Sequence, residues 1–488
     1  MGKKTLGLFL GPLLFAAIML GVRPSGLSNA GVSVLASTVW IAIWWILEVV
    51  PIAVTALIPI ILFPLLGVMD LSETTRSFGH KYIFLYIGGF VLAIAMERWN
   101  LHKRIAIHII YLIGTNVRMI ILGFMLATAF LSMWVSNTAT SVMMLPIALA
   151  IIYQLRDNPN TTENENQIFG KSLLLAVAYS ASIGGVATLI GSPVNLIFLG
   201  IVQETYGVEI TFAQWFVIGL PISAVLLVIC WKYLTGIAFK TGADAFPGGR
   251  TEIKKQLEAL GPVSIQEKAV FAVFTLTAVA WITRSFFLNA LLPGIDDPII
   301  GVAAAVALFL IPANRERTRS LVTWEEAVKL PWGVLLLFGG GLAIAEGFKT
   351  SGLAVWIGQQ MGALQGAYLI VLIVVVVAAV NFLTEITSNL ATVAMILPIL
   401  APLALTIDVH PYMLMVGATI AASCAFMLPV ATPPNAVVFG AGYLRVSDMA
   451  LTGLWMNLLS IALLSIAVYL LLPLMWGFDP NFFPMVFK

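Results

Sequence analysis

Two stretches of the chain decide its fold, because they are nearly the same stretch. Residues 136–147 read SNTATSVMMLPI and residues 388–399 read SNLATVAMILPI. Eight of the twelve positions are identical at a constant offset of 252 (388 − 136). Shared apolar composition explains matching Leu, Ile and Ala, but not Ser-Asn, Ala-Thr and Leu-Pro pairs at fixed spacing. We interpret the two stretches as copies of one structural unit.

The similarity continues on both sides of these stretches. Gly88-Gly89 corresponds to Gly340-Gly341 at the same offset. Further along, GSPVN (191–195) resembles ATPPN (431–435) at an offset of 240 (431 − 191). Each copy therefore contains a glycine pair, a polar Ser-Asn tip and a proline-containing break, in that order.

The composition makes lipid the solvent of this chain. Of 488 residues, 60% are hydrophobic and 10% are charged, whereas a typical soluble domain carries about 25% charged residues. Long unbroken apolar runs favour helices over the alternating strands of a membrane barrel. We predict an all-α, multi-pass membrane protein surrounded by lipid, and the composition argues against a soluble enzyme or a partner that is a nucleic acid.

We expect about 11 transmembrane helices and two re-entrant helical hairpins. The apolar segments 120–152 and 368–405 are too long for one simple span, and each contains a polar cluster and a proline. Non-helical backbone at membrane depth is tolerated only where protein buries it or it lines a cavity. An odd number of crossings separates the two glycine pairs, so the copies are expected to form an inverted repeat, as in many secondary transporters.

The predicted organisation has five parts. They are N-terminal scaffold helices (1–82), a first inverted repeat (83–239, with a hairpin at 118–154 and a broken helix around 191–195), a cytoplasmic loop (240–268), further scaffold helices (269–330), and a second inverted repeat (331–488, with a hairpin at 366–405, a broken helix around 431–435 and the last helix). Basic residues gather on one side when the spans alternate, so the positive-inside rule predicts a cytoplasmic N-terminus. The expected location is the plasma (cell inner) membrane.

The repeated tips carry neutral polar side chains, and such groups inside a bilayer are usually functional. The first tip has Ser132, Ser136, Asn137, Thr138 and Thr140, and the second has Thr384, Thr387, Ser388, Asn389 and Thr392. Amide and hydroxyl oxygens, with freed backbone carbonyls, suit a hard monovalent cation, whereas a carboxylate-rich cage would suit calcium. Asparagine NH2 and threonine hydroxyl groups can donate to an anion, and helix N-termini add partial positive charge.

The proline-containing breaks are expected to unwind in mid-span, because proline has no N–H for the helix. Unwinding would free the carbonyl groups of Gly191 and Ala431 for ions, and would present Ser192 and Thr432 to a substrate. A single Ser or Thr more often bonds back to its own helix. Two copies of the whole set favour a binding site instead.

Other chemical candidates are weaker. Glu48 and Glu385 could carry protons, although a satisfied carboxylate at an interface or helix end explains either residue more simply. Cys230 and Cys424 lie in apolar runs and predict small core residues. The sequence contains no Walker A motif, dinucleotide fingerprint, nucleophile elbow or transition-metal cluster. We therefore expect neither ATP-driven transport by this chain alone nor enzyme activity.

These residues resemble the divalent anion/sodium symporter family, and in particular its Na+-coupled dicarboxylate and citrate cotransporters. The motifs are Ser136-Asn137-Thr138, Ser388-Asn389 and CAFMLPVATPPNAVVFG (424–440), and the resemblance covers most of the chain. It implies a homodimer in which each protomer has a scaffold domain and a transport domain that moves as a rigid elevator. It also implies two or more sodium ions per protomer, with one sodium site in each repeat.

The resemblance further implies which residues bind the ligands. The first sodium site would involve Ser132, Ser136, Asn137 and Gly191, and the second would involve Thr384, Thr387, Asn389 and Ala431. The anion would contact Asn137, Thr138, Ser192, Pro193, Asn389, Thr432 and Pro433. The family pattern is often Ser-Asn-Thr in both repeats, but residue 390 is Leu. The second tip lacks that hydroxyl donor, so we expect an asymmetric site.

The predicted function is Na+-coupled symport of a C4-dicarboxylate such as succinate, malate or fumarate. Two alternatives keep the fold: a sodium-independent exchanger of dicarboxylate or citrate, and a Na+/sulfate symporter. Two others belong to different classes: a membrane-embedded enzyme and a passive channel. The lack of a convergent His/Cys/Asp/Glu set argues against the enzyme, and proline-broken inverted hairpins favour alternating access over the channel.

Overall fold

The computed structural model describes residues 3–21, 24–114, 116–156, 162–241, 249–364 and 366–487. Within these residues the chain is helical, with one isolated β-bridge between Pro312 and Ser320 and no strand. Ten helices of the described part are long and apolar enough to cross a membrane, and five shorter apolar helices accompany them. This is the make-up of an integral, multi-pass, all-α membrane protein, and the sequence predicts about 11 spans and two hairpins.

The chain begins with a short group of helices in which proline sets the boundaries. These are α1 (Lys3–Gly21), α2 (Asn29–Leu47), α3 (Ile52–Thr55), α4 (Ile58–Leu65) and α5 (Leu71–Arg76). The sequence predicts one apolar span over 51–66, but the structure divides it into α3 and α4. Pro59 in the first turn of α4 has no N–H to continue a helix from α3, and this position is one that proline favours.

The repeated glycine pairs allow long helices to cross at close range. α6 (Lys81–Arg98) packs on α16 (Asp297–Leu310), and a Cβ on Gly88 would lie 2.4 Å from the carbonyl carbon of Gly301. α18 (Trp332–Thr350) packs on α3, and a Cβ on Gly340 would lie 2.4 Å from the carbonyl oxygen of Ala56. Small residues permit such backbone approach inside membranes. This explains why glycine occurs at the same place in both copies.

Each Ser-Asn tip joins two helices, and a broken helix follows each pair. The first set is α8 (Val117–Ser132), α9 (Asn137–Arg156), α10 (Glu163–Gly185) and α11 (Pro193–Tyr206). The second set is α20 (Leu369–Leu383), α21 (Asn389–Thr406), α22 (Tyr412–Ala422) and α23 (Pro433–Phe439). The non-helical stretches are 186–192 and 423–432. Each ends at the proline that begins the next helix.

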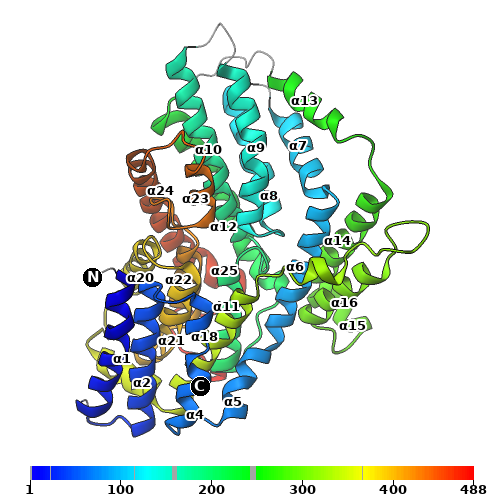
Figure 1. Cartoon of the computed structure of the whole chain (residues 1–488). Helices are drawn as coiled ribbons and strands as arrows, with labels where there is room; N and C mark the ends of the chain where they lie inside the picture. The colour runs from blue at the N-terminus through cyan, green and yellow to red at the C-terminus, as the bar shows by residue number, and fades with distance from the viewer. Residues whose placement is uncertain are drawn as a thin grey trace.

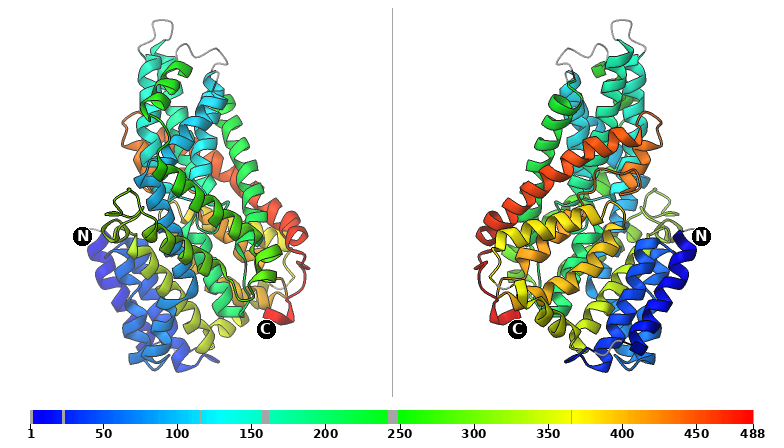
Figure 2. Two further views of the ribbon diagram at one scale, coloured as in Figure 1. Left: turned by 90° about the vertical axis from the view of Figure 1, so that its right-hand side faces the viewer. Right: turned by 90° about the vertical axis from the view of Figure 1, so that its left-hand side faces the viewer.

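The remaining helices surround these two sets. They are α7 (Leu101–Ile113), α12 (Phe212–Lys232), α13 (Gly249–Ala259), α14 (Ile265–Thr283), α15 (Asn289–Leu291), α17 (Trp324–Ala327), α19 (Leu353–Gln360), α24 (Val446–Ile466) and α25 (Leu472–Trp476). α13 lies within 240–268, which the sequence predicts as a loop, and residues 242–248 of that loop lie outside the described residues. Figure 2 shows α24 as a long tilted helix near the C-terminal end of the colour scale.

Helices of the first set pack on helices of the second set at the centre of the molecule. α11 from the first set packs on α21 from the second, and α23 from the second packs on α9 from the first. In Figure 1, α9 and α23 lie above the middle of the molecule, and α11 and α21 lie below it. The helix that follows each break therefore packs on the helix that begins at the tip of the other set.

Candidate functional site

The first Ser-Asn tip gathers four oxygen atoms. Ser132 ends α8 and Asn137 begins α9, and the turn between them brings Ser132 Oγ within 2.6 Å of Asn137 Oδ1. The same Oδ1 lies 3.1 Å from the carbonyl oxygen of Ala181 and 3.3 Å from that of Gly191. Ala181 belongs to α10, and Gly191 belongs to the break after it. Three predicted residues, Ser132, Asn137 and Gly191, therefore meet at one point.

Two glycines make room for this oxygen cluster. A Cβ on Gly185 would lie 2.6 Å from Asn137 Oδ1, and a Cβ on Gly191 would lie 2.8 Å from the carbonyl oxygen of Gly185. Both distances are shorter than any ordinary carbon–oxygen contact. A larger residue at position 185 would push the Asn137 amide away from the two carbonyls, and one at position 191 would press on the backbone of Gly185 and Ser132.

The cluster has the chemistry of a small hard cation site. The Ser132 hydroxyl can donate to the Asn137 amide oxygen, but no hydrogen lies between that oxygen and the two carbonyl oxygens. Either the amide group turns its NH2 toward the carbonyls or a cation binds among them. The four atoms are neutral oxygen ligands, the type that alkali and alkaline-earth ions prefer over transition metals. The described ranges contain no group of three or more His, Cys, Asp or Glu side chains that could hold a metal ion.

The second tip repeats this geometry with Thr in place of Ser. Thr384 follows α20 and donates to Asn389 Oδ1 at 2.6 Å, the distance that Ser132 and Asn137 have in the first tip. Thr384 Oγ1 also lies 3.1 Å from the carbonyl oxygen of Ala422, the last residue of α22. Ser132 and Thr384 are both fully buried. The two hydroxyl groups that correspond in the sequence thus occupy corresponding places.

Two asparagines hold the helix breaks in shape. Asn195 Nδ2 donates to the carbonyl oxygens of Gly185 (3.0 Å) and Thr188 (2.8 Å). In the other copy, Asn435 Nδ2 donates to those of Ala425 (3.2 Å) and Leu428 (3.0 Å). Both asparagines are fully buried, yet neither is among the predicted site residues. Their identical place at the ends of GSPVN and ATPPN is the signal that could have identified them.

Ser192 and Thr432 present hydroxyl groups just before the helices restart at Pro193 and Pro433. Both backbones are extended, with φ of −136° and −139°, and both residues are buried. Thr432 Oγ1 accepts from the N–H of Asn435 at 3.3 Å, which leaves its hydroxyl hydrogen for a ligand. No hydrogen bond of the Ser192 hydroxyl occurs within the described ranges, so this group is also available to a ligand.

Helix N-termini meet between the two tips. Tyr206, at the end of α11, donates to the Ala401 carbonyl late in α21 at 3.2 Å, so these packed helices run in the same direction and begin side by side. The Gly191 carbonyl, just before α11, lies beside Asn137 at the start of α9. The starts of α9, α11 and α21 are therefore neighbours. Their free N–H groups and dipoles favour an anion at this place.

The other predicted residues lie around these groups. Ser136 Oγ accepts from the N–H of Ala139 at 3.2 Å and so caps the first turn of α9, while Thr138 and Pro433 are exposed. The Thr387 hydroxyl bonds to the Thr392 hydroxyl (2.6 Å) and the Leu383 carbonyl (2.9 Å), and the structure does not bring it to Asn389. Ala431 lies in the second break, where its N–H donates to the Leu428 carbonyl at 3.1 Å.

The two weaker acidic candidates differ in environment. Glu48 is exposed at the end of α2, in a left-handed conformation with φ of 44°. Glu385 is buried, and both of its carboxylate oxygens accept hydrogen bonds from the second helix break. Glu385 is therefore a satisfied carboxylate just after the end of α20, as the simpler of the two explanations predicts.

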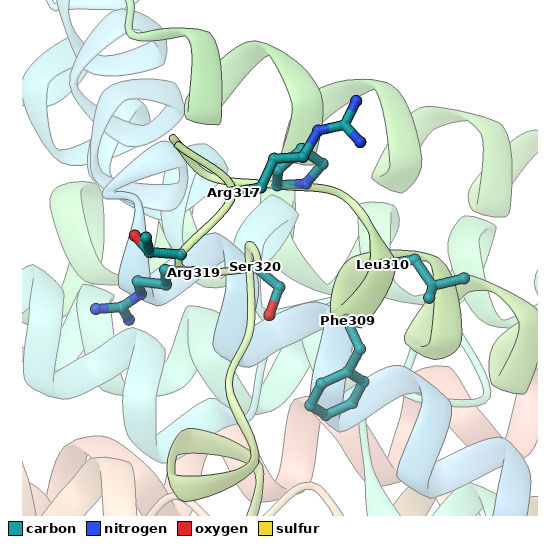
Figure 3. Close-up of a pocket in the computed structure, with 7 residues that line it drawn as sticks. Phe309, Leu310, Arg317, Arg319 and Ser320 are labelled. Atoms are coloured by element: carbon teal, nitrogen blue, oxygen red, sulfur yellow. The ribbon is translucent and has the colours of Figure 1, made fainter. Parts of the chain in front are cut away.

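A hollow of about 320 Å³ lies away from this site, beside the loop after α16 (Figure 3). Phe309, Leu310, Arg317, Arg319 and Ser320 are among the residues that line it. Figure 3 shows the guanidinium groups of Arg317 and Arg319 pointing away from each other, and Arg319 is paired with Glu326 at 2.5 Å. The two cations do not converge on one ligand there.

Comparison with known proteins identifies relatives over nearly the whole chain. The family described as "Sodium:sulfate symporter transmembrane region" matches residues 3–477. The chain is 49% identical over 481 residues to the "Sodium-dependent dicarboxylate transporter SdcS" of Staphylococcus saprophyticus, covering 98% of this chain and 93% of that protein. It is 48% identical over 483 residues, with the same coverage, to the protein of that name from Staphylococcus aureus (strain USA300).

One solved structure resembles this fold at low sequence identity. Its title reads "Structure and Function of Neisseria gonorrhoeae MtrF Illuminates a Class of Antimetabolite Efflux Pumps". The match has a TM-score of 0.60 at 11% identity and covers 96% of each chain. At this identity the likeness concerns the arrangement of helices alone.

Proposed function

This chain belongs to the sodium:sulfate symporter family, and on that premise we propose that it couples sodium entry to the uptake of a C4-dicarboxylate such as succinate, malate or fumarate. The dicarboxylate is chosen because the relatives at 48–49% identity are named sodium-dependent dicarboxylate transporters. The family and these relatives are named as transporters rather than enzymes.

The observation that carries the proposal is the pair of equivalent oxygen clusters. Ser132 with Asn137 and Thr384 with Asn389 make the same 2.6 Å contact in two separate helix pairs. Two cations held at these points would lie on either side of the neighbouring helix starts and of the hydroxyl groups of Ser192 and Thr432. A site with cations at its edges and N–H and O–H donors between them suits a divalent anion.

The charges explain why sodium would be required. None of the predicted site residues carries a charge, so neutral donors alone would meet an anion with two negative charges. Bound sodium supplies the missing positive charge, and each ligand then raises the affinity for the other. A cation gains about 2.3 kcal/mol per 100 mV on entering a negatively charged cell. More sodium charges than anion charges per cycle would therefore drive the anion inward.

We include an inverted repeat in the proposal. The packing of helices from one set on helices of the other supports it. α9 and α23 lie on one side of the site, and α11 and α21 lie on the other, as a two-fold axis in the membrane plane would require. In this proposal the two repeats move as one transport domain against scaffold helices, in a homodimer in the plasma membrane, and the N-terminus is cytoplasmic. Two or more sodium ions accompany each anion.

Purified protein in liposomes tests the proposal. With an inward sodium gradient, labelled succinate should accumulate, and replacing external sodium with choline should abolish the accumulation. Equal uptake in sodium and choline would overturn the symport, and counterflow from preloaded vesicles without sodium would then favour an exchanger.

A second candidate, sulfate, follows from the printed description of the family. Excess unlabelled sulfate added to the same assay separates the two substrates. Strong inhibition of succinate uptake by sulfate, together with sodium-dependent uptake of labelled sulfate, would favour a Na+/sulfate symporter.

A further inference from the structure

Glu385 is a buried carboxylate that the proposed transport cycle does not use. Its Oε1 accepts from the backbone N–H groups of Phe426 (2.8 Å) and Met427 (2.9 Å), and its Oε2 accepts from that of Leu428 (3.0 Å). The side-chain NH2 of Asn457 also donates to Oε1, at 2.7 Å. Glu385 is 3% exposed. It immediately follows Thr384, so one residue joins the second tip to the second helix break.

These contacts favour the ionised form of Glu385. All four partners are donors, and hydrogen bonds from donors stabilise the charged oxygens more than the neutral carboxyl. Hydrogen bonds from backbone N–H groups to a charged oxygen are roughly twice as strong as neutral ones. Three successive N–H groups of a non-helical stretch therefore share one carboxylate, and its negative charge lies within the second half of the site.

The carboxylate also completes the bonding of the stretch that carries Ala431 and Thr432. The carbonyl groups of this stretch are bound by Asn381 (to Cys424, 2.7 Å), Asn435 (to Ala425 and Leu428) and Tyr179 (to Phe426, 2.9 Å). Glu385 supplies the matching acceptors for the N–H groups. Without it, the N–H groups of Met427 and Leu428 would lose this acceptor, and that of Phe426 would keep only the side-chain oxygen of Asn457 at 3.2 Å, which is costly inside a protein.

In the first copy, a neutral group joins the tip to the helix break. Met133 corresponds to Glu385 (385 − 252 = 133), and Thr188 corresponds to Leu428 (428 − 240 = 188). There the Thr188 hydroxyl donates to the Met133 carbonyl and accepts from the Gly191 N–H at 3.0 Å. The same two positions are joined in both copies, by a neutral hydroxyl in the first and by an ionised carboxylate in the second.

We propose that Glu385 is the positioning residue of the second cation site and that its charge gives this site a cation affinity that the first site obtains without a charged residue. The inference rests on the proposed sodium-coupled function and assigns a role that the neutral tip residues do not have. Glu385 does not contact the ion. It fixes the second helix break against Thr384 and adds a negative charge that favours a cation at this tip over the other.

Glu385→Gln tests the charge with little change in shape. The Gln oxygen can still accept from two N–H groups, but its NH2 would face the third donor. We expect the sodium concentration for half-maximal succinate uptake to rise about tenfold, as for other residues that support metal ligands, with the maximal rate at saturating sodium preserved within about twofold. Glu48→Gln removes an exposed carboxylate at a helix end and should leave the sodium dependence unchanged.

A binding measurement separates this role from general stability. Sodium should raise the thermal unfolding midpoint of the wild type in detergent, and this sodium-dependent increase should shrink in Glu385→Gln. If the variant does not fold, Asn457→Ala, which removes one donor and keeps the carboxylate, should raise the half-maximal sodium concentration about threefold. A lower midpoint with an unchanged sodium-dependent increase would mean a structural role only and would overturn the inference.

The two proposals fail in different ways. Wild-type protein that takes up succinate equally with and without sodium overturns the proposed function, whatever Glu385 does. Wild-type protein with sodium-dependent uptake, together with Glu385→Gln that keeps the wild-type half-maximal sodium concentration, overturns only the role of Glu385.

Discussion

The side-chain amide of one asparagine organises each half of the site. The Asn137 amide lies among the oxygens of Ser132, Ala181 and Gly191, and replacing Asn137 with alanine removes the side chain that links them. We expect Asn137→Ala to lower sodium-dependent succinate uptake at least about tenfold, because loss of a metal-site group costs about 10- to 100-fold in metal affinity. Uptake into liposomes at fixed sodium measures the effect.

The matched control for this prediction is Asn314→Ala in an exposed loop, which should transport normally. An Asn137→Ala protein with wild-type flux and wild-type sodium dependence would show that the first tip is not a ligand site.

Gly185 limits the position of the Asn137 amide. Because a Cβ there would lie 2.6 Å from Asn137 Oδ1, we expect Gly185→Ala to displace the amide and to weaken sodium binding more than it weakens folding. Half-maximal sodium concentration and thermal midpoint, measured on the same preparation, separate the two effects. Gly236→Ala, where a Cβ meets nothing within 4 Å, serves as the control. Unchanged sodium dependence in Gly185→Ala would contradict the expected clash between a Cβ at position 185 and the Asn137 amide.

At the scale of helices, the sequence predicted the side chains that recur in both copies. It missed the oxygen atoms that backbone carbonyl groups contribute to the site. The order of glycine pair, polar tip and proline break appears in both copies, and the hydroxyl of Thr384 lies where Ser132 predicts it. The carbonyls of Ala181 and Ala422 are not recognisable from residue type, because every residue has one. The contact of Glu385 with Phe426 spans 41 residues and follows from the folded break, which no local pattern specifies.

The crossing of α6 and α16 depends on Gly88. A Cβ at this position would lie 2.4 Å from a backbone atom of Gly301, and backbone cannot yield as a flexible side chain can. We expect Gly88→Ala to separate the helices and to destabilise the protein by about 1–3 kcal/mol, the usual cost of overpacking. Thermal unfolding in detergent measures the loss. Gly21→Ala, where a Cβ meets nothing within 4 Å, should unfold like wild type. A Gly88→Ala protein as stable as wild type would contradict the close crossing of α6 and α16.

Across the whole molecule, a charge network centred on the buried Arg284 joins segments that are distant in the sequence. Arg284 pairs with Glu209 (2.7 Å) and Asp296 (2.9 Å), and Lys81 pairs with the same two carboxylates at 3.1 and 2.9 Å. In the predicted division of the chain, Glu209 belongs to the first repeat and the other three belong to scaffold segments. The network therefore links the two proposed domains in this conformation.

Removing the central cation of this network should be costly. Arg284 is 4% exposed and also pairs with the buried carboxylate of Asp297 at 2.9 Å, so Arg284→Met would leave that carboxylate without its cation. We expect a loss of about 3 kcal/mol, typical of a buried ion pair that loses one partner. Thermal unfolding measures it, and Arg315→Met in an exposed loop should have little effect. An Arg284→Met protein as stable as wild type would mean that the buried Asp297 carboxylate does not depend on Arg284.

The packing of α23 on α9 has a consequence for biosynthesis. A ribosome makes the first tip early and adds the helix that packs on α9, residues 433–439, only near the end of translation. A chain cut short before that point contains every proposed ion ligand of the first tip but lacks this packing partner of α9. The surroundings of the first pair of helices are therefore completed only late in synthesis.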